Sequence, residues 1–498
     1  MDIDDDNQTQ PSSSQPQPQT QTQTQPSRRI IALVDEAHPF DLESYIANYS
    51  GRTAIDRLIH IIGICPGIAP EAFQLAVQHV HQSRDPSLYQ HVIYAYEQLA
   101  ALPDVNLPNH MEIAQLDTKW ADEMIAKNQA ERIKLEVELK TYTNNMIKES
   151  IRMAHRDLGD FYRSLGEFSS ALKHYTKSRE FCTTSQHVLD MCLSVLELLI
   201  EQRNYSHLPT YVFKAEAALD AATANISSSN NASGASSAPV PMVTSGSKKK
   251  SAERENVQSK LDLATALSHL GQANYEKAAY HLLRIGPSKE LGDWVGKIVA
   301  PGDLAVYGTL CALSSLPRSS LKAQLLENSI FGVYIEQEPY VRELIEAYMG
   351  SNFKTVLELL SRYSTRHQVD IHLSNHVYEL TNLIRNWAVV LYFQPFATIK
   401  LDRMSAAFGW TVEEVEQHVV ALIQSGSIQG RVDSQNKILH AKKTDYRADL
   451  FARAIKAGTE IQATNRKLLL RMRLQQAELI IKPPKGSNNI SEAARDRE

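Results

Sequence analysis

Two histidine pairs come closest, by residue type and spacing, to a metal site. His79 and His81 stand two apart in QHVHQS, the His-x-His spacing of metal-dependent isopeptidases. The surrounding pattern predicts a helix, in which side chains two positions apart point about 200° away from each other and cannot share one metal ion. Tyr89 and Val92 occupy the positions where such a site needs Ser and Asp. We therefore interpret both histidines as packing or surface residues.

The second pair and one glycine motif also fall short of a catalytic site. His372 and His376 lie four apart on an expected helix, a spacing that suits zinc, but no Glu follows His372 and no third ligand is evident. GDWVGK at 292–297 is one residue short for a phosphate-binding loop, and Ile298 replaces the hydroxyl residue that would hold magnesium. We therefore predict no catalytic, metal-binding or cofactor-binding residue, no cofactor, and a protein that is not an enzyme.

Composition and charge restrict the class of protein. The 498 residues are 43% hydrophobic and 22% charged, as in a soluble protein with a buried core. A net charge of −5 gives no general attraction to nucleic acid or to an anionic membrane, and no apolar run approaches the roughly 20 residues that span a bilayer. Four scattered cysteines fit reduced thiols better than a disulfide framework. We expect an intracellular protein whose acidic, polar N-terminus is not a leader.

Three segments have the composition of disordered chain. Residues 1–27 are mostly Gln, Thr, Pro, Ser and Asp, which offer little to bury. Residues 222–254 are rich in Ser, Asn, Ala and Lys and predict a disordered insertion, and residues 483–498 predict a disordered tail. The folded parts are therefore expected in 28–221 and 255–482.

Helical patterning dominates both folded parts. Residues 112–150 place apolar side chains at helical spacing among many charges and predict one long amphipathic helix. Gly159 and Ala171 alternate with Tyr162 and Tyr175 at the spacing of a tetratricopeptide (TPR) repeat. The small residues would let two antiparallel helices approach closely, and the tyrosines would fill the gaps beside them. We predict a mainly α-helical solenoid of irregular TPR-like repeats.

After Pro395 the pattern becomes that of a winged helix. A short strand at 397–401 precedes a helix ended by Gly409, and Thr411 caps a second amphipathic helix. Residues 426–443, GSIQGRVDSQNKILHAKK, then predict a β-hairpin. The repeats are thus expected at 28–221 and 255–363, the winged helix within 364–444, and a long final helix at 445–482.

The second helix of this unit lacks the side chains that read DNA. Base and phosphate contacts need Arg, Lys, Asn or Gln, whereas residues 411–424 contain no Lys or Arg but three carboxylates, Glu413, Glu414 and Glu416. The basic residues lie in the wing and in the final helix, which also has an apolar stripe. We therefore expect the winged helix to meet protein rather than DNA.

Several stretches are distinctive in combination. The chain resembles the PCI-domain proteins that form subunit one of the COP-nine signalosome in DLESYIANYSGRTAIDRL (41–58), IKESIRMAHRDLGDFY (147–162), LAVYGTLCAL (304–313), IRNWAVVLYFQPF (384–396), MSAAFGWTV (404–412) and GRVDSQNKIL (430–439). The resemblance covers roughly 38–222 and 255–482. The Gln/Thr-rich tail and the insertion depart from the family.

This resemblance implies a function and a set of partners. It implies a non-catalytic scaffold subunit of the complex that removes a ubiquitin-like modifier from cullins and so regulates cullin–RING ubiquitin ligases, with the metal-dependent isopeptidase on another subunit. It implies that winged helices join neighbouring subunits edge to edge and that C-terminal helices enter a common bundle. N-terminal repeats would contact cullin–RING ligase components, in the nucleus and the cytoplasm, with no nucleic acid, membrane or cofactor involved.

Candidate interface residues follow from the resemblance by position. The wing supplies an exposed strand able to pair with a neighbour, with Ile428, Arg431, Val432, Ile438 and Leu439. The bundle helix supplies Leu450, Phe451, Ile455, Leu468 and Met472. We expect charged replacements of Ile438 and Leu439 to release the subunit from its complex while leaving it folded. The alternatives are a solvated wing without a partner, a PCI subunit of the proteasome lid or of translation initiation, and a winged-helix DNA-binding regulator.

Overall fold

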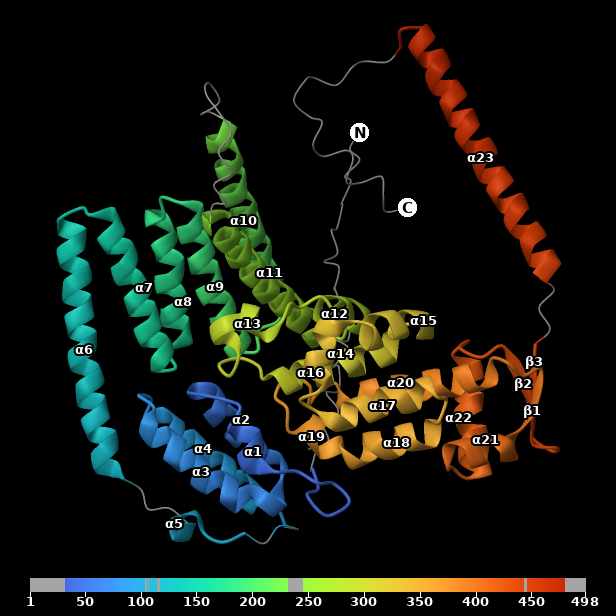
Figure 1. Ribbon diagram of the computed structural model, residues 1–498, viewed down its shortest axis with the longest axis horizontal. Coiled ribbons are helices and arrows are strands. Elements are labelled where there is room, and N and C mark those ends of the chain that lie inside the picture. Colours follow the sequence, from blue (N-terminus) through green and yellow to red (C-terminus); the bar gives the residue numbers. More distant parts are fainter. Residues whose placement is uncertain are drawn as a thin grey trace, which may run out of the picture. The chain divides into compact units, whose positions relative to one another are not determined.

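The computed structural model describes residues 32–103, 105, 107–113, 117–231, 245–442 and 446–479. The described chain is almost entirely helical, with a three-stranded sheet near its C-terminal end (Figure 1). It divides into two units, one reaching to Tyr392 together with Ala407–Gly409, and one formed by the rest. The predicted fold class, mainly α with a helical-repeat solenoid, a winged helix and a long C-terminal helix, is confirmed.

The first helices fold around an apolar core of their own. They are α1 (Leu42–Ile46), α2 (Arg52–Ile64), η1 (Pro66–Ile68), α3 (Ala69–Gln82), α4 (Ser87–Ala100) and α5 (His110–Ile113). Apolar residues recur at helical spacing in α2, α3 and α4, so each of these helices buries one face against the others. Among the described residues no single helix is long and apolar enough to cross a membrane, although α2 together with η1 and α3, bent by 118°, reaches that length and composition.

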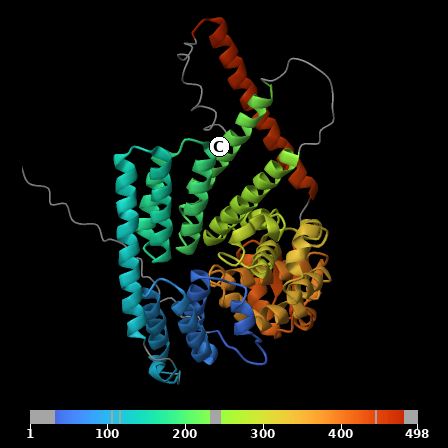
Figure 2. The same cartoon turned by 60° about the vertical axis from the view of Figure 1, so that its left-hand side comes forward.

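The next helices pack in sequence order, each against the one that follows. They are α6 (Thr118–Asn144), α7 (Lys148–Ser164), α8 (Phe168–Ser178), η2 (Arg179–Phe181), α9 (Ser185–Glu201), α10 (Leu208–Asn231) and α11 (Ser245–Gly271). Figures 1 and 2 show α6 to α9 side by side in one layer. The single helix predicted over 112–150 is wrong. The chain turns between α6 and α7 through Met146, whose φ of 53° lies in the left-handed region that ends a helix.

Three predicted segments lie wholly or partly outside the described residues. The tails expected at 1–27 and 483–498 fall there, as does 232–244 in the middle of the insertion expected at 222–254. The two ends of that insertion are helical instead of disordered: α10 continues to Asn231, and α11 starts at Ser245. Helical structure therefore enters the expected insertion from both sides.

The close approach of two helices predicted at Gly159 is present between α7 and α8. A Cβ atom at Gly159 would lie 2.5 Å from a ring carbon of Tyr175, well inside van der Waals contact. Ala171 and Tyr175 are both buried. Tyr162 stacks on His174 beside them, with ring centroids 5.3 Å apart. The small residues and the tyrosines thus pack as the repeat pattern predicts.

The helices before the sheet include one buried helix that packs against several others. They are α12 (Tyr275–Leu282), α13 (Ser288–Leu291), η3 (Gly292–Trp294), α14 (Pro301–Ser315), α15 (Arg318–Leu321), η4 (Lys322–Leu326), α16 (Ser329–Ile335), α17 (Pro339–Met349), α18 (Phe353–Arg362), α19 (Ser364–Gln368) and α20 (Val377–Phe393). α14 is buried on every side from Asp303 to Ser314, as a helix that is apolar all round should be.

Four buried charged side chains connect the N-terminal helices to α14 and α19. Arg57 of α2 donates to Asp370 at 2.6 Å and to Asp303 at 3.2 Å. Arg366 of α19 donates to Asp303 at 2.9 Å, and the Tyr307 hydroxyl donates to Asp370 at 2.5 Å. Burial alone would raise the pKa of Asp370, but the adjacent Arg57 guanidinium holds that pKa below its ordinary value. Each of the two buried carboxylates thus has an arginine partner in the interior.

The winged helix has the predicted elements in the predicted order. They are β1 (Thr398–Lys400), α21 (Leu401–Phe408), α22 (Val412–Gln424), β2 (Gly430–Asp433) and β3 (Ile438–Ala441), followed by α23 (Tyr446–Gln476). Thr411 caps α22 as predicted, since its hydroxyl accepts the Glu414 N–H at 3.3 Å while the Glu414 carboxylate accepts the Thr411 N–H at 2.9 Å.

Replacing Gly159 with Ala tests the helix contact. The added methyl group must displace the buried Tyr175 ring, so we expect Gly159→Ala to lower the free energy of unfolding by about 1–3 kcal/mol. The matched control is Gly458→Ala in α23, where no atom lies within 4 Å of the new Cβ and the change should be neutral or slightly stabilising. Urea unfolding followed by circular dichroism measures both; equal stability of the two variants would contradict the contact.

Candidate protein-binding surfaces

The sheet of the winged helix has one central strand and two outer strands. Its order is β1-β3-β2, so β3 is flanked on both sides. In the antiparallel register Leu439 of β3 pairs with Ile399 of β1 and with Val432 of β2. Paired residues share one face of a sheet, so these three side chains form one layer. Ile399 and Leu439 are buried and Val432 is half-buried, which identifies this layer as the core side of the sheet.

Two of the five predicted wing residues are not available to a partner. Leu439 has no exposed surface and Ile428 is 4% exposed, because both side chains belong to the core of the winged helix. The expectation that charging Ile438 and Leu439 together leaves the chain folded therefore fails at Leu439, where a carboxylate would be buried without a counter-charge. The hairpin pattern in the sequence could not show that β3 lies between two strands.

The other three wing residues remain candidates. Ile438 points to the face opposite Leu439, Arg431 is exposed on β2, and Val432 is half-buried. β2 is an outer strand that pairs with β3 along one edge, and no described residue pairs with its other edge. That edge therefore presents backbone N–H and C=O groups to which a strand of another chain can bond.

The carboxylates of α22 serve the fold of the winged helix. Glu414 completes the cap at Thr411, and Glu416 accepts hydrogen bonds from Lys437 and Ser434 of the wing. The hydrogen bond from Lys437 is the main cause that holds the pKa of Glu416 below its ordinary value. This pair fastens the wing to α22, a helix whose sequence contains no Lys or Arg to contact a phosphate backbone.

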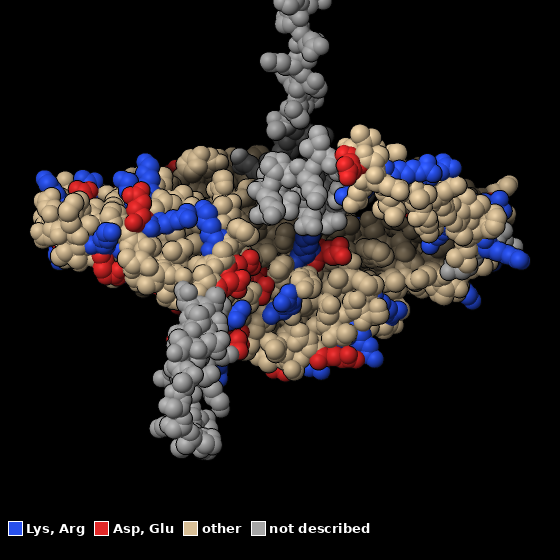
Figure 3. Space-filling view, turned by 90° about the horizontal axis from the view of Figure 1, so that it is seen from above, with Lys and Arg blue, Asp and Glu red and all other residues tan. Residues whose placement is uncertain are grey.

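Charges elsewhere on the described surface are mixed. On the face that Figure 3 shows, Lys and Arg side chains (blue) and Asp and Glu side chains (red) lie in small separate groups among uncharged residues. Such a surface creates no extended field of one sign on that face, in keeping with the net charge of −5.

The final helix, α23, carries a row of exposed apolar side chains. The exposed fractions are 50% for Leu450, 69% for Phe451, 53% for Ile455, 51% for Leu468 and 65% for Met472. At about 100° per residue, the five positions fall within an arc of about 140°, along one side of the helix. A helix of this length is stabilised mainly by packing its apolar side against other elements. The five predicted residues of α23 are therefore exposed, and their role as an interface stays a prediction.

The histidines that resembled metal ligands have other partners. The ring of His81 packs edge-on against Trp120 with centroids 5.0 Å apart. His372 and His376 lie in a turn, where the helix predicted for them is absent, and their Nδ1 atoms bond the hydroxyls of Tyr205 and Tyr275 at 2.7 and 3.2 Å. No three His, Cys, Asp or Glu side chains among the described residues are placed to share a metal ion.

The glycine motif at 292–297 is part of the packing. Trp294 has no exposed surface, and its Nε1 donates to Glu197 of α9 at 2.7 Å. Gly292 and Gly296 have φ values of 55° and 82°, which allow the chain to turn around the indole ring. The motif thus joins the loop before α14 to α9.

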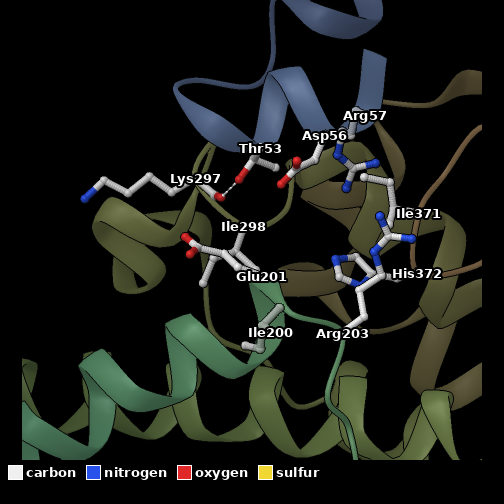
Figure 4. A pocket seen from close by; sticks show the side chains of 10 residues that line it. All are labelled: Thr53, Asp56, Arg57, Ile200, Glu201, Arg203, Lys297, Ile298, Ile371 and His372. Atoms are coloured by element: carbon white, nitrogen blue, oxygen red, sulfur yellow. Dashed lines mark hydrogen bonds between the residues drawn. The ribbon is translucent and has the colours of Figure 1, made fainter. Parts of the chain in front are cut away.

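A small polar pocket lies where α2, the end of α9 and residues 297–298 meet residues 371–372 (Figure 4). Burial raises the pKa of Asp56 there to about 6, and burial lowers the pKa of His372 to about 4. The Lys297 side chain points away from the pocket (Figure 4). A volume of about 20 Å³ suits one water molecule and excludes a metabolite.

Comparisons with known proteins give a consistent result. Residues 117–324 match a family model described as 26S proteasome subunit RPN7, and residues 357–443 match the PCI domain. COP9 signalosome complex subunit 1 of Arabidopsis thaliana is 34% identical over 88% of this chain and 91% of its own length. Subunit 1b of Drosophila melanogaster is 32% identical over 92% and 90%. The 26S proteasome non-ATPase regulatory subunit 6 of Oryza sativa subsp. japonica is 22% identical over 41% and 51%.

Substitutions at adjacent positions of β3 test the two faces of the sheet. Leu439→Asp buries an unpaired carboxylate, and we expect residues 430–441 to lose their protection from hydrogen exchange. Ile438→Asp changes the outer face, so those amides should keep their protection, with a cost within about 1 kcal/mol. Hydrogen exchange read by mass spectrometry compares the two; equal loss of protection would contradict the strand order.

Proposed function

The chain belongs to the family of COP9 signalosome complex subunit 1, and from that premise we propose that it is a non-catalytic scaffold that joins other signalosome subunits. In this proposal the complex removes a ubiquitin-like modifier from cullins and thereby regulates cullin–RING ubiquitin ligases. The metal-dependent isopeptidase belongs to another subunit, and the assembly acts in the nucleus and the cytoplasm.

The apolar side of α23 is the observation that carries the scaffold role. Every side chain of α23 whose exposure is described is exposed, including Leu450, Phe451, Ile455, Leu468 and Met472. An exposed apolar row of this length favours association. Each Å² of apolar surface that an interface removes from water stabilises the complex by about 25 cal/mol. A bundle of helices from several subunits is the proposed destination of this row.

Two further surfaces suit protein partners. The open edge of β2, with Arg431 and Val432, supports pairing with the winged helix of a neighbouring subunit. In the repeats, Ile125, Ile133 and Val137 of α6 are each more than half exposed and share one side of the helix. This side of α6 is the proposed contact with cullin–RING ligase components.

Substitutions on the two sides of α23 test the proposal. A Phe451→Glu/Ile455→Glu/Leu468→Glu variant should enter the complex at least about tenfold less well, because buried apolar anchors contribute about 1 kcal/mol or more each. The control, Lys456→Glu/Lys467→Glu, alters the opposite side and should assemble normally. Native mass spectrometry after co-expression with the other subunits gives the assembled fraction, and circular dichroism checks that both variants are folded.

The partners recovered also separate this function from its nearest alternative. The match of residues 117–324 to the RPN7 model favours a proteasome-lid subunit as the second candidate. Purification of the tagged chain should recover signalosome subunits and cullins. Recovery of proteasomal subunits instead, or normal assembly of the Phe451→Glu/Ile455→Glu/Leu468→Glu variant, would contradict the proposal.

A further inference from the structure

A cleft of about 300 Å³ lies on the repeats, where α9 and α10 pack against each other. Its volume is at the lower end of the range of about 300–1,000 Å³ found for ligand sites, so it has room for a few side chains of a partner. Val188 and Met191 of α9 form part of the lining of this α9–α10 cleft, together with Ala217 and Ala218 of α10.

The apolar lining is open to water along α10. Val212, Ala215 and Leu219 are buried, so one side of α10 packs into the repeats. Phe213 and Ala217 lie about 40° apart on another side of the helix, and both line the cleft. The Phe213 side chain is 72% exposed. A partner that covers this ring removes apolar surface from water, which stabilises the complex.

Two cations line the cleft beside these apolar groups. Arg179 is exposed, and the Lys214 ammonium lies 4.5 Å from the centroid of the Tyr211 ring. Neither cation forms a hydrogen bond or an ion pair with a carboxylate of the described residues. The first turn of α9, which begins at Ser185 in the cleft, contains no acidic residue either. The positive charge at the cleft is therefore available to a partner.

The carboxylates on the neighbouring elements do not offset these cations. No Asp or Glu is among the described residues that line the cleft. Asp190 of α9 accepts a hydrogen bond from Gln186, and Glu197 and Glu201 both pair with Arg163. The other acidic residues of η2 and of the described part of α10 lie outside the lining: Glu180, Glu216 and Asp220. An acidic partner therefore meets cations without a counter-charge.

The combination of apolar surface and cations selects the class of partner. Nucleic-acid binding rests on contacts with several phosphates, about six to ten in a typical case, and an anionic membrane attracts clusters of about four to eight basic residues. Two cations beside an apolar lining are too few for either. They suit a peptide that has apolar and acidic side chains together, and a groove between two helices accepts an amphipathic helix.

We propose that the α9–α10 cleft binds a short amphipathic helix of a protein partner, whose apolar side is flanked by Asp or Glu residues. The apolar side chains of this helix cover Phe213 and Val188, and its carboxylates pair with Arg179 and Lys214. The cleft shares no residue with the wing, α23 or the exposed side of α6, so this binding does not depend on the contacts proposed for the scaffold.

A phage-displayed library of random peptides, each about 16 residues long, is the probe that tests the cleft. Selection on the immobilised full-length chain, with counter-selection on Phe213→Ala, isolates peptides that need the exposed ring. The recovered peptides should have apolar residues at helical spacing (i, i+3 or i+4, and i+7) and a net negative charge. The charge is an independent result, because the counter-selection acts on an apolar side chain only.

Charge reversals then test the two cations. Fluorescence anisotropy of a labelled copy of each recovered peptide should show binding at least about tenfold weaker to Arg179→Glu/Lys214→Glu than to the unmodified chain. The matched control is Lys134→Glu/Lys140→Glu on α6, where both lysines are exposed and outside the cleft. The control has the same change in net charge and should alter binding less than about twofold. Circular dichroism checks that all variants are folded.

Three results would overturn the proposal. Recovery of no peptide that distinguishes the unmodified chain from Phe213→Ala would show that the cleft binds no peptide. Neutral or basic peptides, or equal weakening by the two charge variants, would show that Arg179 and Lys214 do not select an acidic partner. Flotation with phosphatidylserine vesicles should give equal recovery of the unmodified chain and of Arg179→Glu/Lys214→Glu; a loss in that variant would assign the cleft to a membrane surface.

Discussion

The pairing of Arg57 and Arg366 with Asp303 and Asp370 is the interaction on which the first unit depends. All four side chains are buried, and each carboxylate bonds an arginine at 3.2 Å or less. Removing one partner of such a group leaves a charge in the interior without compensation, at a cost of about 3–5 kcal/mol. The network therefore favours one register of the N-terminal helices on α14 and α19 over the alternatives that apolar packing alone would allow.

This constraint also organises the surfaces of the unit. Arg57 donates to the Tyr45 hydroxyl and its guanidinium lies over the Tyr49 ring, so the network also fixes these two rings at α1. Arg366 donates to Glu338 as well as to Asp303, so the network reaches the start of α17. The wing and α23 belong to the other unit, where Glu416 and Lys437 form an ion pair between α22 and the wing.

Local patterns in the sequence predict the helices and strands. Contacts between distant segments determine which side chains are buried together and which strand is central. Gly159 with Tyr175, and Thr411 with Glu414, are short-range signals, and both pairs are found in contact. Arg57 and Asp370 are 313 positions apart, so no local pattern in the sequence predicts that they pair. The hairpin pattern predicts Leu439 as an interface residue, because alternation along the hairpin does not show which strand becomes central. The pattern does not predict the helix break at Met146, because a left-handed φ at methionine has no sequence signature.

Hydrogen exchange of an Arg57→Met variant, compared with Arg84→Met, tests the central claim most directly. Arg84 bonds Glu131 at the surface, so its loss should change stability by less than about 1 kcal/mol and leave exchange unaltered. Arg57→Met should cost about 3–5 kcal/mol and should raise exchange in α2, α14 and α19 together, because Asp370 loses its arginine partner and Asp303 keeps only Arg366. Faster exchange confined to α2, or stability equal to that of Arg84→Met, would contradict the account.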